Sequence, residues 1–463
     1  MRSTAARSPP AYFKTMPRRP DDVTFLLRDA VLNSLAAHVA SGRPLATGFS
    51  GGRDSVVLLD ALAAIAPERN LAVTAVHIHH GLSTNADHWA QFCVERCSEL
   101  GIACVVRRVN VVRQARASLE ALARHARYAA LAEVARGIGA TVVALAHHRN
   151  DQAETLLLQL LRGGGPHGLA AMPALRVDAG GTAWWRPLLG IPRSLIDAYA
   201  RDRKLTWIDD ESNVDVSLAR NAVRHRVLPT LLAIAPQADA NLARAAAHQA
   251  EAARLLDELA EHDAAGAFDG AMLQREALDM LAPHRARNLL RWFLRGQGLP
   301  APSTTRLAAM LDQLRGARGD AVIRLAHAGV EIGVHHGRIA LHSTPPDSFD
   351  VRWNGEAELK LPHGVLAFGR AQGSGIDLAQ LGQEVHVRSR VGGERFQVAA
   401  DRPRRALKSI LRDAGIPPWE RGGLPLIFCG DALAAVAGLG IDASHCAAPG
   451  RPGLTIAWQP TTG

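Results

Sequence analysis

The stretch Pro44-Leu-Ala-Thr-Gly-Phe-Ser-Gly-Gly-Arg-Asp-Ser55 carries the strongest structural signal in the chain. Its first half is a short apolar run typical of a buried strand, and residues 56–65 continue with helical spacing. Gly51 and Gly52 allow a positive φ and a close approach of the backbone to a ligand. A strand, a glycine-rich bend and a helix in this order predict an anion site where the helix begins.

The bend lacks the lysine that is typical of a Walker A phosphate-binding loop. No Gly-Lys-Ser/Thr sequence occurs anywhere in the chain, so a Walker A loop is excluded. Ser50 and Ser55 supply hydroxyl donors instead. Asp54 is a carboxylate and would repel a phosphate unless a divalent cation bridges them, which points to Mg²⁺. The alternative interpretation is a plain tight turn with Asp54 near a helix N-cap.

Strand-like and helical segments alternate on both sides of this bend. Short β-branched runs at 44–49, 72–78, 103–109 and 141–146 are separated by helical patterns at 56–65, 86–100, 118–136 and 152–161. Strands that are apolar along most of their length are expected to be buried on both faces. Strand–helix alternation predicts an α/β fold with a doubly wound parallel sheet over 23–235, and ligands bind at the carboxyl ends of such strands.

The rest of the chain has a different character. Residues 1–22 are basic without an apolar core, which predicts a disordered arm rather than a secretory signal. Residues 236–345 contain helical patterns at 238–262, 285–295 and 304–316 followed by short alternating runs, which predicts a mainly helical α+β domain. Residues 346–463 are rich in Gly and Pro, and we expect a small α+β domain with one helix near 405–413.

Composition narrows the class of protein. The 463 residues include 53 Lys+Arg and 44 Asp+Glu, a formal charge of +9, which favours a polyanionic partner. Five scattered cysteines do not form a disulfide framework and suit the reducing cytoplasm. No apolar run reaches the roughly 18 residues that span a bilayer, so we expect no membrane association.

A second motif, Ala146-His-His-Arg-Asn-Asp-Gln-Ala-Glu-Thr155, follows the strand at 141–146. Asp151 and Glu154 are three residues apart, so both carboxylates lie on one face of a helix. Such a pair can hold Mg²⁺ or steer an incoming amine. The same spacing also fits a capping box with Asp151 as the N-cap, and both interpretations can hold together.

Several other patterns are more simply explained by packing. Histidines at strand ends lack a further ligand with metal-site spacing, which favours packing or hydrogen-bonding roles; they are His77, His79, His80, His147 and His148. Cys93 and Cys97 are expected to be small buried apolar residues. Gly163-x-Gly165-x-x-Gly168 follows a helix, so it is not a dinucleotide fingerprint.

The hexapeptide Ser50-Gly-Gly-Arg-Asp-Ser55 resembles the signature of the PP-loop ATP pyrophosphatases. The resemblance implies that residues 50–55, Arg53 included, bind ATP, that the bond between the α- and β-phosphates breaks, and that AMP passes to an acceptor oxygen. Mg²⁺ near Asp54 is expected with it.

The second motif and its surroundings resemble the tRNA(Ile)-lysidine synthetase family. The matching positions are His147, His148, Asp151, Gln152, Glu154, Thr155, Arg162, Gly163, Gly165, Gly168 and Leu169, and the stretches Ala126-Arg-Tyr128 and Arg186-Pro-Leu-Leu189 also match. Asn150 departs from the pattern, because the family more often has Asp there. The resemblance implies ATP-dependent ligation of free lysine to C2 of the wobble cytidine of a CAU-anticodon isoleucine tRNA, with Asp54, Arg127, Asp151 and Glu154 as catalytic residues.

Positive charge gathers toward the C-terminus. Residues 388–421 contain nine Lys/Arg and four acids, and arginines spread over a small module suit phosphate contacts. Our candidates for tRNA contacts are Arg220, Arg224, Arg388, Arg390, Arg395, Arg404, Arg405 and Lys408. For Arg220 and Arg224, contacts to the nucleotide and plain surface charge are the alternative interpretations. Trp419 is either a base-stacking or a core residue. A homodimer is left open.

Two other functions compete with lysine ligation. A PP-loop tRNA thiolase would need catalytic cysteines or an iron–sulfur cluster, and the spacing of Cys93, Cys97 and Cys104 fits neither. A non-catalytic RNA-binding protein would use the charge alone and would not turn over ATP.

Overall fold

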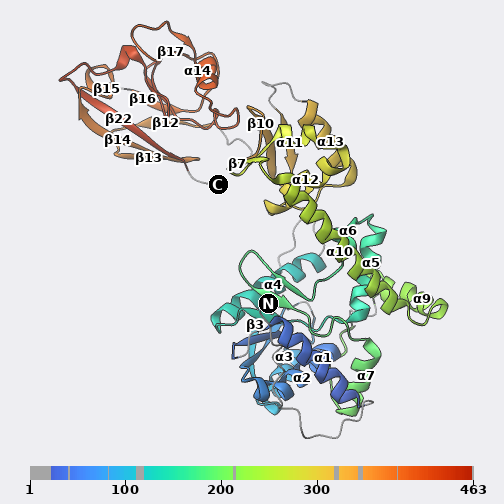
Figure 1. Ribbon diagram of the computed structural model, residues 1–463. Coiled ribbons are helices and arrows are strands. Elements are labelled where there is room, and N and C mark those ends of the chain that lie inside the picture. The colour runs from blue at the N-terminus through green and yellow to red at the C-terminus, as the bar shows by residue number, and fades with distance from the viewer. Residues whose placement is uncertain are drawn as a thin grey trace, which may run out of the picture. The chain divides into compact units, whose positions relative to one another are not determined.

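The computed structural model describes residues 22–39, 42–81, 83–110, 119–211, 215–316, 323–342, 348–382 and 384–460. The chain divides into two compact units, Met1–Leu255 and Leu256–Gly463 (Figure 1). The predicted arm, 1–22, lies outside the described residues except for Asp22. That residue caps the first helix, because its carboxylate accepts hydrogen bonds from the backbone N–H groups of Thr24 and Phe25.

The first unit alternates strands and helices. Its strands are β1 (Leu45–Gly48), β2 (Val73–His79), β3 (Ala103–Arg108), β4 (Val142–Ala144), β5 (Leu175–Val177) and β6 (Ala183–Trp185). Its helices are α1 (Val23–His38), α2 (Arg53–Arg69), α3 (Ala86–Glu99), α4 (Leu119–Gly137), α5 (Arg149–Leu161), α6 (Pro166–Leu169), α7 (Arg193–Asp202), α8 (Ala219–Ala222), the π-helical turn η2 (Val223–Val227) and α9 (Leu228–Ile234). The long helix α10 (Ala238–Ala264) runs across the boundary between the units.

The strands form one six-stranded sheet in the order β3-β2-β1-β4-β6-β5. All neighbours pair in parallel except β5, which pairs antiparallel with β6 at the edge. The predicted doubly wound parallel sheet is confirmed. The hairpin of β5 and β6 was not predicted, because each of its strands has only three residues.

Alternate residues of the central strands enter two different cores. Leu45 of β1 and Trp185 of β6 belong to the core under α1, α2 and α7. Ala46 and Trp184, one position away, belong to the core under α4. The period of two explains why these strands are apolar along their whole length: both faces of the sheet are covered.

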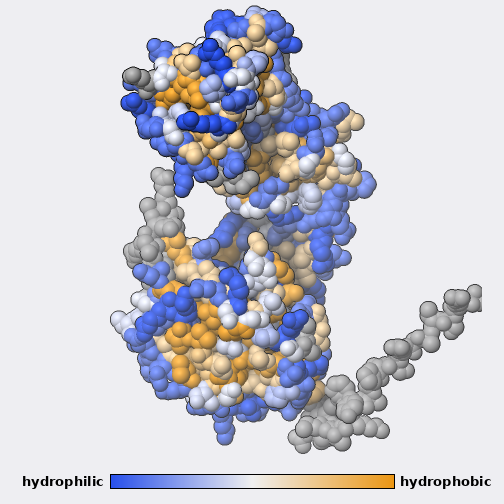
Figure 2. All heavy atoms as spheres, turned by 90° about the vertical axis from the view of Figure 1, so that its left-hand side faces the viewer, coloured by the Kyte–Doolittle hydropathy of each residue, from blue (hydrophilic) through white to orange (hydrophobic). Residues whose placement is uncertain are grey.

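Strand β3 does not follow the expectation of burial on both faces. It is the edge strand, and four of its six residues are exposed. Figure 2 looks onto the side of the first unit where β3 lies, and apolar residues are visible there at the surface. The prediction was wrong for this strand because composition does not reveal the position of a strand in its sheet.

The second unit contains antiparallel sheets and short helices. Its first part has α11 (Arg275–Met280), α12 (Pro283–Gly296) and α13 (Thr304–Gly316) beside a sheet of β7 (Phe268–Asp269), β8 (Met272–Gln274), β9 (Arg324–His327), β10 (Val330–His335) and β11 (Arg338–His342). One apolar core joins these helices and strands. Part of the stretch with the short alternating runs, residues 317–322 and 343–347, lies outside the described part of the chain.

The last part of the chain is richer in strands. One sheet contains β12 (Asp350–Trp353), β16 (Val385–Arg388), β19 (Leu426–Cys429), β20 (Ala432–Val436) and β21 (Gly440–Ile441). The other contains β13 (Glu358–Leu361), β14 (Gly364–Gln372), β15 (Ile376–Asp377) and β22 (Pro452–Pro460), and the two share a core. A small hairpin of β17 (Arg395–Phe396) and β18 (Arg405–Ala406) precedes α14 (Leu407–Asp413), close to the helix predicted at 405–413. Two 3₁₀ turns, η3 (Leu378–Gln380) and η4 (Ala443–His445), complete the unit.

Candidate active site

The carboxyl ends of β1, β2, β4 and β6 meet at one edge of the sheet, as parallel strands require. The bend after β1 leads into α2, and the loop after β4 leads into α5. Both motifs singled out in the sequence therefore lie at the edge where ligands bind in this class of fold.

The bend after β1 has the backbone of an anion cradle. Gly51 has a φ of +80°, and Gly52 is the N-cap of α2 without a side chain to cap the helix. The Ser55 hydroxyl donates to the Gly52 carbonyl oxygen at 2.8 Å, and the Ser50 and Ser55 hydroxyl oxygens are 3.1 Å apart. Unpaired N–H groups at the start of α2 can bind a phosphate, and each hydroxyl can donate to it once its single proton turns away from these internal bonds.

Close packing leaves no room for a side chain in this bend. A Cβ at position 51 would lie 2.6 Å from Ile208 Cδ1 and 3.1 Å from Cys93 Sγ. Positive φ and this lack of space together require glycine at position 51. Cys93 is fully buried, as expected for a small apolar residue.

The two charged residues of the bend point to different partners. The Arg53 guanidinium lies 2.8 Å from the Asp197 carboxylate on α7 and over the ring of Trp207. The Asp54 carboxylate lies 3.5 Å from Nε2 of His148, at the other motif. The Arg53 side chain is therefore bound at the wall of the site, whereas the Asp54 carboxylate points toward the second motif.

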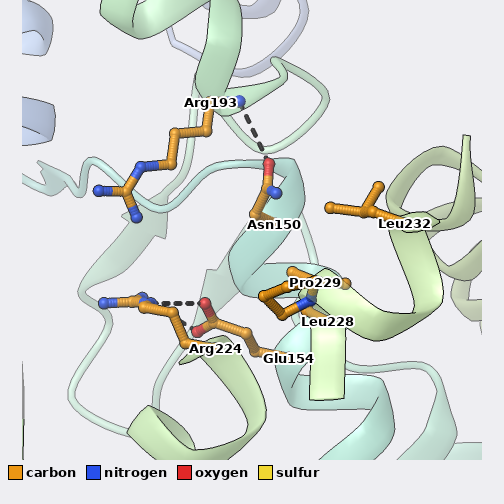
Figure 3. Close-up of a pocket in the computed structure, with 7 residues that line it drawn as sticks. All are labelled: Asn150, Glu154, Arg193, Arg224, Leu228, Pro229 and Leu232. Atoms are coloured by element: carbon orange, nitrogen blue, oxygen red, sulfur yellow. Dashed lines mark hydrogen bonds and ion pairs between the residues drawn. The ribbon is translucent and has the colours of Figure 1, made fainter. Parts of the chain in front are cut away.

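The second motif holds two buried carboxylates between two arginines. Arg220 Nε lies 2.9 Å from Glu154 Oε2, and Arg220 Nη2 lies 2.8 Å from Asp151 Oδ1. Arg224 Nε lies 2.7 Å from Glu154 Oε1 (Figure 3). Arg224 Nη2 lies 3.2 Å from Asp151 Oδ1. Glu154 is 1% exposed. The π-helical turn η2 continues α8, and both segments contact α5, so that arginines four residues apart reach the same pair.

Arg220 and Arg224 were predicted as tRNA contacts, but their guanidinium groups are bound to Asp151 and Glu154. The sequence pattern did not show this pairing, because about 70 residues separate the two pairs. Only the docking of α8 and η2 on α5 brings them together.

The helix cap differs from the predicted capping box. The N-cap of α5 is His148, and its backbone N–H donates to Asp151 Oδ2 at 2.9 Å. Asp151 is therefore the third residue of the helix rather than its N-cap, and Glu154 lies one turn further on. The capping interpretation was wrong in register, because the helix begins at Arg149, three residues earlier than we expected.

His148 links the two motifs. Its Nε2 lies 3.5 Å from Asp54 Oδ2 and also 3.5 Å from Asp151 Oδ2, and its side chain is 1% exposed. Burial lowers its pKa, but the nearby carboxylates of Asp54 and Asp151 outweigh burial, so the net pKa is raised. The sequence analysis assigned it only packing or hydrogen bonding. Sequence reasoning missed its position beside two acidic residues, because these residues belong to different motifs.

The pKa values of the two carboxyl groups next to His148, those of Asp54 and Asp151, are lowered instead. Burial raises the pKa of Asp54, but the hydrogen bond and the charge of His148 outweigh burial and leave the pKa below its usual value. Burial likewise raises the pKa of Asp151, while the charges of His148 and Arg220 lower it further than burial raises it. Both groups are therefore ionised at neutral pH.

The other histidines differ in their surroundings. His77 Nδ1 lies 3.0 Å from the Phe49 carbonyl oxygen, and His79 Nε2 lies 3.2 Å from the Asp87 carboxylate. Burial lowers the pKa of His80, and the nearby charge of Arg127 on α4 lowers it further. Within the described ranges, no group of three or more His, Cys, Asp or Glu side chains is arranged to hold a metal ion.

Asn150 binds the backbone rather than the other site residues. Its Oδ1 accepts a hydrogen bond from the backbone N–H of Arg193 at 3.2 Å, and Arg193 begins α7 (Figure 3). The amide thus ties the start of α5 to the start of α7.

Most of the predicted C-terminal contact residues are held within the second unit. Arg390, Arg404 and Arg405 pair with the carboxylates of Glu394, Asp442 and Asp413. The other candidates are bound less tightly or exposed: Arg388 lies over the Phe428 ring, Arg395 donates to a backbone carbonyl oxygen, and Lys408 is exposed.

Trp419 is packed against the sheet of β10 and β11. Its ring stacks on His342 with centroids 4.5 Å apart, and a Cβ at Gly333 would lie 2.5 Å from it. Of the two interpretations of this tryptophan, packing is the one that the structure shows.

A parallel sheet with a lysine-free, glycine-rich bend before its second helix defines the PP-loop class, and the PP-loop domain model matches residues 28–231. The model of the TilS substrate binding domain matches residues 273–340, and that of the TilS substrate C-terminal domain matches residues 385–458. A relative named tRNA(Ile)-lysidine synthase is 44% identical over 96% of this chain, so the chain belongs to the tRNA(Ile)-lysidine synthase family.

Curated relatives match along nearly the whole chain. The tRNA(Ile)-lysidine synthase of Nitrosomonas europaea is 44% identical over 450 residues, which cover 96% of each chain. That of Ralstonia nicotianae is 40% identical and covers 92% of this chain and 96% of its own. That of Azoarcus sp. strain BH72 is 39% identical over 92% of this chain and 94% of its own.

No helix in the described part of the chain is both long enough and apolar enough to cross a membrane.

Proposed function

We propose that this protein is a ligase that uses ATP to join free lysine to C2 of the wobble cytidine of a CAU-anticodon isoleucine tRNA. The observation that carries the proposal is the 44% identity to a tRNA(Ile)-lysidine synthase over 96% of both chains. The site adds chemical support, because a phosphate cradle and a buried carboxylate pair lie at one edge of the sheet, joined through His148.

The reaction has two steps. The C2 oxygen of the cytosine attacks the α-phosphorus of ATP, and pyrophosphate leaves. The ε-amine of lysine, having lost a proton, then attacks C2, and AMP leaves with the former C2 oxygen. Adenylation is needed because a ring carbonyl oxygen is a poor leaving group, and the site lowers the barrier mainly by positioning and charge.

Residues 50–55 bind the triphosphate in this proposal. The N–H groups at the start of α2 and the hydroxyls of Ser50 and Ser55 face the phosphates. Arg127 contributes a positive charge near the strand ends, where it influences His80. A guanidinium there can stabilise charge that grows on the departing pyrophosphate.

Asp54 fits the role of a Mg²⁺ ligand. Its Oδ1 is buried and has no hydrogen-bond partner in the structure. Mg²⁺ commonly takes one or two carboxylates together with substrate phosphates, and Asp54 precedes Ser55 at the cradle. When bound there, the ion would offset the negative charge of the phosphates.

The lysine subsite is proposed beside the carboxylate pair. A small pocket there combines a carboxylate, two guanidinium groups and apolar walls (Figure 3); it is lined by Asn150, Glu154, Arg193, Arg224, Leu228, Pro229 and Leu232. Free lysine carries a carboxylate, two amines and an aliphatic chain, and this lining has a complement for each. Arg220 and Arg224 hold Asp151 and Glu154 in place while leaving lone pairs for an ammonium group.

The remaining assignments are also proposals. Residues 23–235 form the catalytic domain, while 236–345 and 346–463 bind the tRNA; the three family models fall inside these ranges. A cytoplasmic location and a homodimer stay predictions, the latter testable by light scattering of the purified protein.

A direct assay tests the proposed function. The purified protein is incubated with ATP, radiolabelled lysine and a transcript of the isoleucine tRNA with a CAU anticodon. We expect label in the tRNA, with AMP and pyrophosphate as products. Absence of label, or release of ADP, would overturn the proposal; pyrophosphate exchange without lysine transfer would limit it to the adenylation step.

A further inference from the structure

Arg186 is a buried arginine that the proposed reaction does not use. It follows β6 directly, at the edge where β1, β2 and β4 end, and it is 4% exposed. Its Nη1 donates to the Pro173 carbonyl oxygen at 2.9 Å. Its Nε is buried and has no hydrogen-bond partner.

The surroundings of Arg186 do not balance its charge. The partly exposed guanidinium groups at this edge, Arg220 and Arg224, each pair with carboxylates. Among the described residues, no ion pair joins Arg186 to a carboxylate. Burial lowers its pKa, a hydrogen bond with Tyr128 raises it, and the charges of Arg176 and Arg124 lower it, so the net pKa lies below its usual value. A buried cation without a counter-charge is costly, so an anionic ligand at this position would stabilise it.

A second unpartnered polar group lies on the neighbouring strand. β4 pairs with β6 through Ala144 and Trp185; Arg186 directly follows β6, and His147 lies three residues after the end of β4. Nδ1 of His147 is buried without a hydrogen-bond partner. Two adjacent strand ends thus each carry a buried nitrogen that no described group satisfies.

The position of Arg186 separates it from the nucleotide cradle. Strand β4 lies between β1 and β6, so the ends of β1 and β6 are about 10 Å apart. Tyr128 of α4 packs on Trp184, in the core on the opposite face from α2, and contacts Arg186. The bend that starts α2 serves the triphosphate, and Arg186 is placed for a different phosphate group.

We propose that Arg186 binds the RNA substrate. Its guanidinium donates a hydrogen bond to an oxygen of a phosphodiester beside the nucleotide that is modified. This inference rests on the proposed function for the identity of the RNA. It assigns to the first unit a tRNA contact that lies next to the chemistry, in addition to the basic residues of the C-terminal region.

The test measures how strongly salt weakens tRNA binding. Filter binding of the isoleucine tRNA transcript is followed between 50 and 200 mM KCl, without ATP or lysine. Each phosphate contact contributes about 0.7–0.9 to the slope of log affinity against log salt. Arg186→Gln should therefore lose about threefold less affinity over this range than the wild type, with unchanged ATP affinity. Arg186→Lys keeps the charge and should keep the slope.

The control is Arg43→Gln, which removes an exposed arginine just before the amino end of β1. Its slope should equal that of the wild type. The proposal is overturned if Arg186→Gln keeps the wild-type slope, if Arg186→Lys loses as much as Arg186→Gln, or if Arg186→Gln instead weakens ATP binding alone.

A measurement on the wild-type chain covers the case in which the variants fail to fold. Single neutral methylphosphonate linkages are placed in turn around the wobble nucleotide. One of them should weaken binding and flatten its salt dependence, and wild-type binding unaffected at every linkage refutes the contact. Neither binding assay requires turnover, so a failure of lysine transfer would contradict the proposed function without deciding this inference.

Discussion

Glu154 shows how burial determines what a single charge does in this site. Its carboxylate is 1% exposed and binds two guanidinium groups. Burying ions costs free energy that only close pairing offsets, so removing one partner leaves the others uncompensated. A residue of this kind affects both stability and chemistry.

Glu154→Gln should lower the free energy of unfolding by about 3–5 kcal/mol, because Arg220 and Arg224 lose a charged partner in a buried position. Denaturant unfolding measures the change. The matched control is Glu133→Gln, which breaks an ion pair with Arg107 whose side chains are 60% and 47% exposed. That change should cost less than about 1 kcal/mol. Equal effects of the two substitutions would contradict the role of burial.

Asp54→Asn keeps the shape of the side chain but removes the charge that faces the phosphate cradle. We expect lysine transfer to fall about a hundredfold or more, with little change in thermal stability. Asp87→Asn provides the control, because Asp87 is 76% exposed on α3 and lies outside the cradle. Full transfer by the Asp54 variant would exclude both the magnesium role and the catalytic role.

The adjacent histidines should have opposite effects on the pH dependence of stability. Burial lowers the pKa of His147 to about 3, while the pKa of His148 is raised. His148 therefore stabilises the fold fully below pH 6.5 and loses this contribution as pH rises through its folded pKa. His147 contributes above pH 6.5, and the contribution is lost as pH falls from 6.5 toward 3.

The pair is tested with His148→Gln and His147→Gln in unfolding experiments from pH 8 to pH 5.5. On acidification the wild type should gain stability relative to the His148 variant and lose it relative to the His147 variant. The ordinary pKa of an Asp carboxyl is near 3.9, and those of Asp54 and Asp151 lie lower still, so these groups titrate below this window. Parallel trends in the two variants would contradict the assignments.

At the scale of elements, the junction between β1 and α2 is the place where we propose that the nucleotide binds. Gly51 combines a φ of +80° with neighbours too close for a Cβ. The bend is therefore determined by the packing of Ile208 and Cys93 against it as much as by its own sequence.

Gly51→Ala should abolish ATP binding and destabilise the fold, because strain from the positive φ adds to a clash with Ile208. Gly139→Ala is the matched control, since Gly139 has a φ of +73° but a Cβ added there would meet nothing within 4 Å. It should cost only about 1–2 kcal/mol of backbone strain and leave ATP affinity unchanged. Nucleotide titration and thermal melting separate the two effects.

Across the molecule as a whole, net positive charge does not by itself identify the RNA contacts. Arg404 is bound to Asp442, which is fully buried, whereas Lys408 is exposed on α14. Arginines that stabilise the C-terminal domain and cations that can meet the tRNA are neighbours in the sequence.

Lys408→Gln should reduce the salt dependence of tRNA binding, lowering the slope by about 0.9, without changing stability. Arg404→Gln should instead lower the free energy of unfolding by about 2 kcal/mol, because a buried carboxylate loses a charged partner. Filter binding and denaturant unfolding are measured on both variants. If Arg404→Gln changed only tRNA binding, the structural role of its ion pair would be refuted.

Local sequence patterns were sufficient to predict the parallel sheet, the cradle at residues 50–55 and the placement of the Asp151–Glu154 pair near the start of a helix. These features depend on periodicity, on glycine and on the rule that parallel strands end at one edge, so they can be predicted within a short window. The family resemblance was also present in the order and spacing of its motifs.

Only the tertiary structure shows which charged side chains contact one another. The pairing of Arg220 and Arg224 with the carboxylates and the bridge from Asp54 through His148 join segments far apart in the sequence. The unpartnered Nε of Arg186 is likewise visible only in the folded chain. Exposure of β3 likewise depends on its place at the sheet edge. Electrostatic energy depends on distance and burial, and neither is contained in the local pattern of residues.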